Sequence, residues 1–392
     1  MEGKKINQFE KLKIGDVIKD KENNLENEYM IIEYIDSGGF GNIYKAKILG
    51  NNDEILIIKE NYRSYLEKEK IITDIITEKG EMNENLAHYG LIYKDAQKNK
   101  TYFTSKYYNG GNLSQFIKNC KEITMEMIQY IMIHIIHGLK FLHSKDICHK
   151  DIKPQNILIH YENEEDRKKQ DILKSLLVIV DFSISKKICK NIKDDYDNPN
   201  EGTINYRHPK LNEILFLNKK ENYTLKKELD IWSLGLVCLE LFTKKLTFDY
   251  NKAKGEEEKK NLAKSQTYEI PLNDNTYIEI VSFIDNMLQY NPENQIQIKE
   301  LQDHEFLKKK VESFTEFPKK KAGDKLKNDS LVLNFRNGLN FKYEELYGEI
   351  KDDKEEITNK INEIFIYLNE NSLFTNQILI PIIPKIEENE NH

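Results

Sequence analysis

The chain has 392 residues, of which 39% are hydrophobic and 32% are charged. This length exceeds what one small core supports, and the composition is that of a globular protein with a polar surface. The formal net charge of −7 provides no overall basic field, so the sequence predicts no nucleic-acid binding.

Neither a membrane segment nor a disulfide framework is expected. No run of about 18 apolar residues could span a bilayer, and residues 1–20 lack the continuous apolar core of a secretory signal. The cysteines Cys120, Cys148, Cys189 and Cys238 form no pair or cluster with metal-binding spacing. Reduced thiols are therefore expected, in a protein of the cytoplasm or the nucleus.

The hydrophobic pattern changes along the chain. Residues 1–28 are charged and are predicted to form an N-terminal extension. Residues 29–106 contain short apolar runs broken by glycines and polar turns, which indicates a small β-rich lobe with one helix. Residues 107–310 carry longer patterns at helical spacing, notably over 125–142 and 229–242, which indicates a larger helical lobe.

Residues 311–392 are predicted to form a C-terminal extension that is partly helical. An amphipathic pattern runs from Leu346 to Leu368, and an apolar stretch with a proline runs from Ile378 to Ile383. The helical pattern is expected to pack on the larger lobe, dock a partner protein or mediate self-association. The apolar stretch could lie in a groove of the same chain.

A glycine-rich turn near the start of the β-rich lobe contains Gly38, Gly39 and Gly41. Glycines let backbone amides approach phosphate groups closely because no Cβ intervenes, although a simple hairpin turn explains the same residues. Lys59 ends an apolar run that reads as a strand. A buried ammonium there needs an anionic partner, which phosphate groups and a helix carboxylate would provide.

The segment from Ile147 to Leu158 supplies the remaining groups for phosphoryl transfer. That reaction needs a carboxylate to accept a hydroxyl proton, a cation near the transferred phosphate, and oxygen ligands for Mg²⁺. Asp151, Lys153 and Asn156 supply these groups within a few residues. Asp181 follows a later apolar run and adds a second hard oxygen ligand.

Taken in this order, the motifs resemble those of the eukaryotic protein kinase family over about residues 29–310. The resemblance implies a two-lobed α+β fold, with a β-rich N-lobe (29–106) that has one main helix and a larger, mostly helical C-lobe (107–310). Gly202-Thr203 resembles the end of the family's activation segment. Thr203 after Gly202, together with Lys153 in the motif Asp-x-Lys-x-x-Asn, is the pattern of the family's serine/threonine-specific members.

The resemblance implies ATP and Mg²⁺ as cofactors and a protein as substrate. In it Asp151 is the catalytic base, Lys153 lies near the γ-phosphate and Lys59 binds the α- and β-phosphates. Asn156 and Asp181 would hold Mg²⁺. Besides Lys59, the nucleotide would contact Ile35, Gly38, Gly39, Gly41, Ile43, Ile57, Ser105, Tyr107 and Leu158.

Two glutamates could pair with Lys59. Glu69 shares a helix face with Ile72 and Ile76 and is favoured, whereas Glu67 is the alternative. Because either residue is close to Lys59 in sequence, the connection between strand and helix must be short.

Several positions depart from the family pattern. Asp36 replaces the first glycine of the turn, and Ile57 replaces an alanine above the adenine, where its branched bulk should crowd the purine. Ser105 is the gatekeeper, and its small side chain predicts a pocket behind the adenine that admits bulky purine analogues. Lys210 and Gln295 replace the glutamate and the arginine of a buried ion pair, so both partners change together.

Lys150 replaces the arginine that clamps a phosphorylated activation segment, and a lysine cannot reproduce its two parallel bonds. We hypothesise that carboxylates of Asp194, Asp195 and Asp197 replace the phosphate, so that activity needs no phosphorylation of the segment. A solvated acidic turn is the alternative.

The favoured function is an active serine/threonine protein kinase. A pseudokinase scaffold is the alternative. It is supported by Asp36, by Ile57 and by Ser183, which replaces the family's glycine after Asp181-Phe182. A kinase for small molecules would not need the motif Gly202-Thr203. The charged insert at residues 160–175 is expected to be a solvated surface loop.

Overall fold

The structure, a computed structural model, describes most of the chain up to residue 314 and a short segment of the C-terminal extension. The described residues are 11–19, 27–38, 41–50, 54–95, 100–188, 198, 200–218, 227–265, 267–271, 276–291, 294–314 and 330–334. Within these ranges no helix has both the length and the apolar character needed to cross a membrane.

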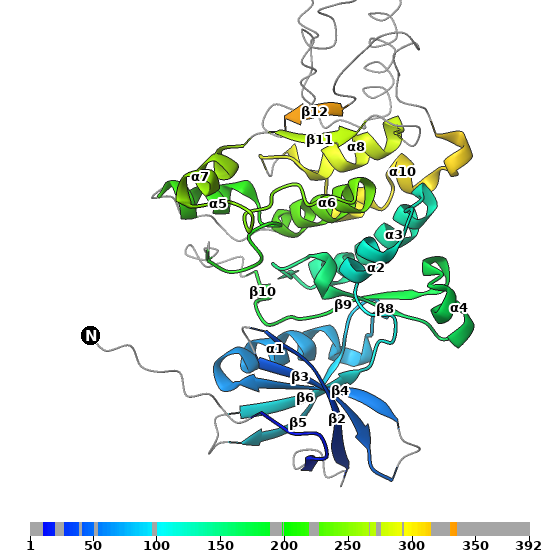
Figure 1. The fold of residues 1–392 in the computed structure, drawn as a ribbon, viewed down its shortest axis with the longest axis vertical. Helices are drawn as coiled ribbons and strands as arrows, with labels where there is room; N and C mark the ends of the chain where they lie inside the picture. Colours follow the sequence, from blue (N-terminus) through cyan, green and yellow to red (C-terminus); the bar gives the residue numbers. More distant parts are fainter. Residues whose placement is uncertain are drawn as a thin grey trace, which may run out of the picture.

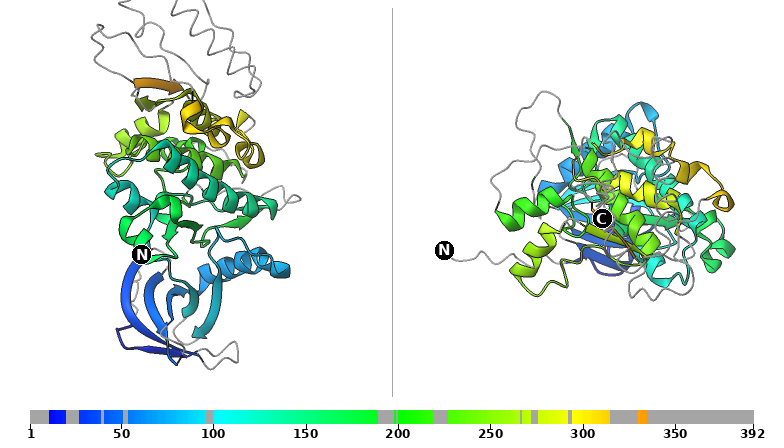
Figure 2. Two further views of the ribbon diagram at one scale, coloured as in Figure 1. Left: turned by 90° about the vertical axis from the view of Figure 1, so that its right-hand side faces the viewer. Right: turned by 90° about the horizontal axis from the view of Figure 1, so that it is seen from above.

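These residues form two lobes, a curled sheet with one helix at one end and a mostly helical lobe at the other (Figures 1 and 2). The predicted two-lobed α+β fold is confirmed. The N-lobe sheet is antiparallel, with strand order β1-β2-β3-β4-β6-β5. Its strands are β1 (Val17–Lys19), β2 (Glu28–Gly38), β3 (Gly41–Ile48), β4 (Ile55–Tyr62), β5 (Tyr89–Asp95) and β6 (Lys100–Lys106).

Part of the predicted N-terminal extension belongs to this sheet. Strand β1 pairs with β2, with Val17 opposite Met30. Alternate residues of β3, including Tyr44 and Ala46, are fully buried, and they pack with Ile58 in a small core. This alternation follows from the two-residue period of a strand, and it turns the odd-numbered side chains to the opposite face.

Strand β4 places two adjacent charges on opposite faces. Glu60 is buried on the core face, where its carboxylate accepts hydrogen bonds from Lys100 and from Asn42, both at 2.6 Å. Lys59 therefore faces the other way, toward the C-lobe. Pairing continues to Tyr62, so the expectation that Lys59 ends a strand was wrong. Helix α1 (Arg63–Ile76) begins at the next residue. The connection between β4 and α1, which was expected to be short, therefore contains no loop residue.

The C-lobe is built around α3 (Met125–Ser144) and α6 (Glu228–Thr243), most of whose buried apolar residues belong to one large core. Thr124 begins α3 by accepting a hydrogen bond from the backbone N–H of Met127, as expected of an N-cap threonine. The C-lobe helices are α2 (Leu113–Asn119), α3 (Met125–Ser144), α4 (Glu164–Lys169), α5 (Pro209–Leu217), α6 (Glu228–Thr243), α7 (Glu256–Lys264), α8 (Ile278–Met287), α9 (Ile298–Leu301) and α10 (Glu305–Lys308).

Short strands and single helical turns connect these helices. Two small antiparallel pairs lie near the N-lobe: β7 with β10 and β8 with β9. The strands are β7 (Ile147–Cys148), β8 (Ile157–His160), β9 (Leu176–Ile179), β10 (Lys186–Lys187), β11 (Thr267–Pro271) and β12 (Ser330–Asn334). The 3₁₀ turns are Glu78–Gly80, Pro154–Asn156, Ile172–Lys174 and Val311–Ser313.

The charged insert at residues 160–175 is on the surface, but it contains a helix, so the expectation of a loop was wrong. Acidic residues occupy the first turn of α4 and basic residues the last, and none of its residues is buried. This order of charges complements the helix dipole. Asn163 also caps the helix by accepting the N–H of Glu165.

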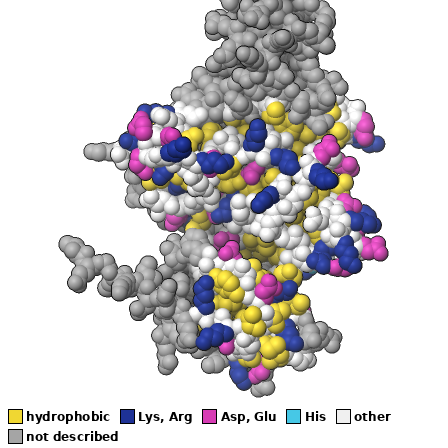
Figure 3. All heavy atoms as spheres, in the orientation of Figure 1, with side chains coloured by type: hydrophobic (Ala, Val, Ile, Leu, Met, Phe, Trp, Pro, Cys, Tyr) yellow, Lys and Arg dark blue, Asp and Glu magenta, His cyan; other side chains and the backbone are white. Residues whose placement is uncertain are grey.

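The described part of the C-terminal extension lies on the C-lobe. Strand β12 pairs in antiparallel register with β11 on the side of the C-lobe away from the N-lobe (Figure 1). The predicted helical pattern from Leu346 to Leu368 and the apolar stretch from Ile378 to Ile383 lie outside the described residues. On the face of the molecule that Figure 3 shows, acidic and basic side chains are intermixed over the described part of both lobes.

Candidate active site

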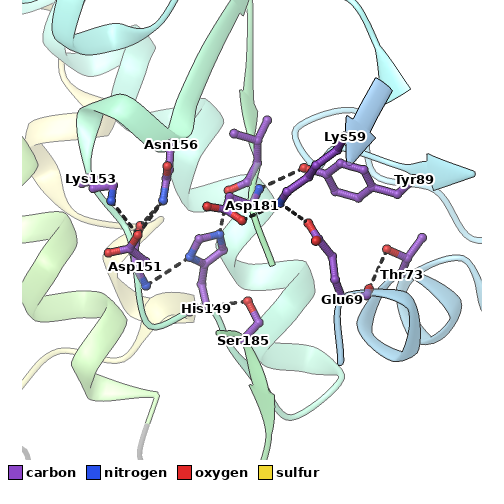
Figure 4. A network of polar contacts seen from close by, with 11 residues as sticks. Lys59, Glu69, Thr73, Tyr89, His149, Asp151, Lys153, Asn156, Asp181 and Ser185 are labelled. Carbon is purple, nitrogen blue, oxygen red and sulfur yellow. Dashed lines mark hydrogen bonds and ion pairs between the residues drawn. The ribbon is translucent and has the colours of Figure 1, made fainter. Parts of the chain in front are cut away.

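Lys59 lies between the two lobes and joins two carboxylates. Its ammonium is 2.8 Å from the Oε1 of Glu69 on α1 and 2.8 Å from the Oδ1 of Asp181, which follows β9 (Figure 4). Glu69 is fully buried, at 0% exposure. Of the two candidate glutamates the structure pairs Glu69 with Lys59, and the side chain of Glu67 lies outside the described residues.

The charges of this cluster stabilise one another. Burial opposes ionisation of Lys59, but the carboxylates of Glu69 and Asp181 outweigh it and raise the pKa of the ammonium. Burial also opposes ionisation of Asp181, yet Lys59 lowers the pKa of this carboxyl to about 2. Asp181 is therefore an anion at neutral pH, the form in which a carboxyl group ligates a hard cation.

Phe182 anchors the segment that carries Asp181. The phenyl ring is fully buried, and its centroid lies 5.5 Å from the His149 ring and 6.0 Å from the Tyr89 ring, edge-on in both pairs. Asp181 itself has a φ of +70°, in the left-handed region that non-glycine residues rarely adopt. Its N–H donates to the Tyr89 hydroxyl at 3.1 Å. Sequence reasoning missed Tyr89, because a single aromatic residue opening a strand gives no local signal.

The carboxylate of Asp151 is held from several sides. Its Oδ1 accepts hydrogen bonds from the Thr203 N–H at 2.9 Å and from the Thr203 hydroxyl at 2.7 Å. Its Oδ2 accepts from Asn156 at 2.9 Å and lies 2.7 Å from the ammonium of Lys153. Asn156 donates through Nδ2, so its amide oxygen is the atom that it could offer to a cation.

Asp230 on α6 fixes the loop that carries Asp151. This buried carboxylate accepts the N–H of His149 at 2.8 Å and that of Lys150 at 2.7 Å. It also accepts a bond from the ring of His143 at 3.0 Å. Such charge-assisted bonds hold backbone as well as side chains, so the loop that carries Asp151 is tied to the core of the C-lobe.

Apolar side chains line the same face of the N-lobe. Ile57 and Lys59 are two residues apart in β4 and therefore face the same side, and Ser105 lies opposite Ile57 in β6. Ile43, Ile57, Ser105 and Leu158 are partly exposed, and Ile35 is 43% exposed. A flat aromatic ligand could cover this apolar surface.

The glycine-rich turn and Tyr107 complete the predicted site. Gly38 and Gly41 pair at the tip of the β2–β3 hairpin, and Gly41 has a φ of +150°, which a side chain rarely allows. Gly39 lies outside the described residues. Tyr107 follows β6, with the ammonium of Lys45 at 4.4 Å from its ring centroid.

A family model described as the protein kinase domain matches residues 29–307. The chain belongs to the protein kinase family. The kinase is similar to a probable serine/threonine-protein kinase nek1 of Dictyostelium discoideum, with 28% identity over 313 residues that cover 75% of this chain and 59% of the relative.

Two further relatives of this kinase have comparable likeness. The serine/threonine-protein kinase ULK3 of Xenopus laevis is 27% identical over 286 residues, which cover 71% of this chain and 55% of that protein. The mitogen-activated protein kinase kinase 2 of Arabidopsis thaliana is 33% identical over 211 residues, or 52% of each chain. The kinase thus spans little more than half the length of these curated relatives.

The lysine in the kinase catalytic loop has a carboxylate partner from the activation segment. Lys150 is 4% exposed at its side chain, and its ammonium bonds the carboxylate of Glu201. Sequence reasoning placed a carboxylate in this role but chose Asp194, Asp195 and Asp197, which lie outside the described residues. Glu201 precedes Gly202-Thr203 and so connects this ion pair to Thr203, which bonds Asp151.

Lys210 and Gln295, which replace the two partners of an ion pair in the family pattern, each contact other groups. The ammonium of Lys210 lies 5.1 Å from the centroid of the Tyr290 ring, a cation–π geometry. The Tyr290 hydroxyl donates to buried Glu213 at 3.0 Å, and Gln295 donates to the Met287 carbonyl at 2.6 Å. The ammonium of Lys210 therefore lies against an aromatic ring, and Gln295 bonds the backbone.

Proposed function

We propose that this chain is an active protein kinase that transfers the γ-phosphate of ATP to serine or threonine hydroxyls of proteins. The observation that carries the proposal is the joining of Glu69, Lys59 and Asp181 by bonds of 2.8 Å. This arrangement aligns α1, β4 and the segment after β9, and phosphoryl transfer depends on such positioning.

The residues present fit both cofactors. Lys59 offers a positive charge for phosphate oxygens, and the carboxylate of Asp181 and the amide oxygen of Asn156 are the hard donors that Mg²⁺ favours. When bound, Mg²⁺ would neutralise charge on the transferred phosphate. Asp151 would orient the attacking hydroxyl and accept its proton, and Lys153 would place a positive charge beside the reacting oxygens.

Serine/threonine specificity is supported by the contact between Lys153 and Thr203. The ammonium donates to the threonine hydroxyl at 2.6 Å, while the same hydroxyl donates to Asp151. This triangle fixes the end of the activation segment against the proposed base. The names of the relatives in Dictyostelium and Xenopus describe serine/threonine kinases, which is consistent with the proposal.

Activity without phosphorylation of the activation segment is part of the proposal. The carboxylate of Glu201 already supplies a negative charge to Lys150, which is where a phosphate would otherwise be needed. A lysine ammonium is a compact point charge that one carboxylate can neutralise, whereas the planar guanidinium of arginine binds a carboxylate or a phosphate through two parallel bonds.

A nucleotide-independent scaffold is the second candidate, and Ile57 is the observation that favours it. This bulky side chain lies on the cleft face, opposite Ser105, where it should crowd a purine ring. The small side chain of Ser105 leaves room beside it, which supports the first candidate.

The test is Mg²⁺-dependent transfer of phosphate from ATP to a generic protein acceptor. Asp151→Asn should lower the rate by on the order of 10²- to 10⁴-fold, because the base is lost. Asp303→Asn is the matched control, since this aspartate is 71% exposed and pairs only at the surface with Lys308. Equal rates for wild type and Asp151→Asn would contradict the proposal. If neither protein transfers phosphate, absence of ATP binding to wild type with recovery in Ile57→Ala would favour the scaffold.

A further inference from the structure

Tyr89 belongs to a row of three side chains across the cleft face of the N-lobe sheet. It is the first residue of β5 and lies opposite Ser105 in β6, and Ser105 lies opposite Ile57 in β4. Directly opposed residues of antiparallel strands share a face, so the small Ser105 side chain stands between two large ones. The space that serine leaves on this face is therefore bordered by the Tyr89 ring.

The Tyr89 side chain contacts the centre of the proposed site. Its hydroxyl accepts the N–H of Asp181 at 3.1 Å (Figure 4). Its ring meets the Phe182 ring edge-on. The ammonium of Lys59 lies 5.7 Å from the centroid of the Tyr89 ring. The Tyr89 side chain thus contacts both Asp181 and Phe182, and it lies next to the Lys59 ammonium that pairs with Asp181.

Asp181 needs such support because its backbone is strained. A φ of +70° brings the Cβ of a non-glycine residue close to its own peptide, and this conformation persists only where neighbouring groups fix it. Lys59 holds the Asp181 carboxylate at 2.8 Å, and Tyr89 holds the Asp181 N–H. Two bonds on opposite ends of the residue set the direction in which the carboxylate points.

We propose that Tyr89 is a positioning residue that holds Asp181 in the orientation in which its carboxylate meets Lys59 and can ligate Mg²⁺. The assignment of a metal-binding role rests on the proposed function. Burial raises the pKa of Tyr89, so its hydroxyl stays neutral at physiological pH and accepts the N–H without adding a third negative charge to the cluster.

Tyr89→Phe tests this role because it deletes only the hydroxyl. The matched control is Tyr102→Phe, which deletes the hydroxyl of another buried tyrosine of the sheet, bonded to Glu60 at 3.3 Å on the opposite face. The first readout is amide hydrogen exchange of the peptide containing Asp181, by mass spectrometry. We expect exchange to accelerate about fivefold in Tyr89→Phe, as for loss of one neutral hydrogen bond, and to stay unchanged in Tyr102→Phe.

The second readout is the Mg²⁺ concentration that gives half-maximal phosphate transfer at saturating ATP. It should rise about fivefold in Tyr89→Phe, while the KM for the protein acceptor stays unchanged. Unchanged exchange at Asp181 would overturn the proposal. So would a lowered melting temperature with an unchanged Mg²⁺ requirement, because that is the signature of packing alone. A wild-type protein that neither binds ATP nor transfers phosphate would refute the proposed function, and hydrogen exchange would still decide the role of Tyr89.

Discussion

The ion pair between Lys150 and Glu201 should hold the activation segment in the place of a phosphate. Glu201→Gln keeps the shape of the side chain and removes its charge. The Lys150 side chain is only 4% exposed, whereas that of Glu201 is 31% exposed. The substitution therefore weakens the bond between the buried ammonium of Lys150 and a Glu201 side chain that is partly accessible to water.

The magnitude follows from this unequal burial. A hydrogen bond to a charged group contributes about 1.5–3 kcal/mol, and screening at the partly exposed glutamate places the pair near the lower end of that range. About 1.4 kcal/mol corresponds to a tenfold change in an equilibrium. We therefore expect a coupling free energy of about 1.5 kcal/mol, and a fall in activity of up to roughly tenfold for Glu201→Gln.

The assay is a double-mutant cycle of Lys150→Met and Glu201→Gln, measured by urea unfolding and by phosphate transfer with dephosphorylated protein. The pair Lys70 and Asp74 on α1 is the internal control, with an N–O distance of 2.6 Å but side chains 40% and 61% exposed. Its coupling should be only about 0.3–0.5 kcal/mol. Effects of Lys150→Met and Glu201→Gln that add within about 0.5 kcal/mol would refute the reasoning. A dephosphorylated wild type that is inactive until its activation segment is phosphorylated would refute it as well.

Three further predictions concern stability and the nucleotide site. Burial raises the pKa of Asp285 from 3.8 to about 7, so its contribution to stability is fully present below about pH 4 and is lost as the pH rises to 7. Asp285→Asn should remove about 4 kcal/mol of pH dependence from urea unfolding between about pH 4 and 7, and an unaltered pH profile would speak against it. Purine analogues with bulky substituents should inhibit wild type more strongly than Ser105→Met, because methionine would fill the space next to Tyr89, and equal potency would count against that pocket. Ile57→Ala should lower the KM for ATP about fivefold by relieving about 1 kcal/mol of crowding, and steady-state kinetics showing no decrease would contradict the expected crowding.

The sequence by itself determined the family and the two-lobed fold. Phosphoryl transfer requires a base, a cation and metal ligands at close quarters, so Asp151, Lys153 and Asn156 stand within one short loop and can be recognised by spacing. The sequence also predicted the buried helices α3 and α6, since their apolar residues recur at helical spacing.

Only the tertiary structure decided which distant groups meet. The helical pattern favoured Glu69 over Glu67 as the partner of Lys59, and the structure pairs Glu69 with Lys59 on a helix that begins without a loop after β4. Glu201 lies 51 residues from Lys150, and Tyr89 lies 92 residues from Asp181. Contacts across such separations are set by how strands and loops pack, and an isolated glutamate or tyrosine has no local pattern that would reveal its partner.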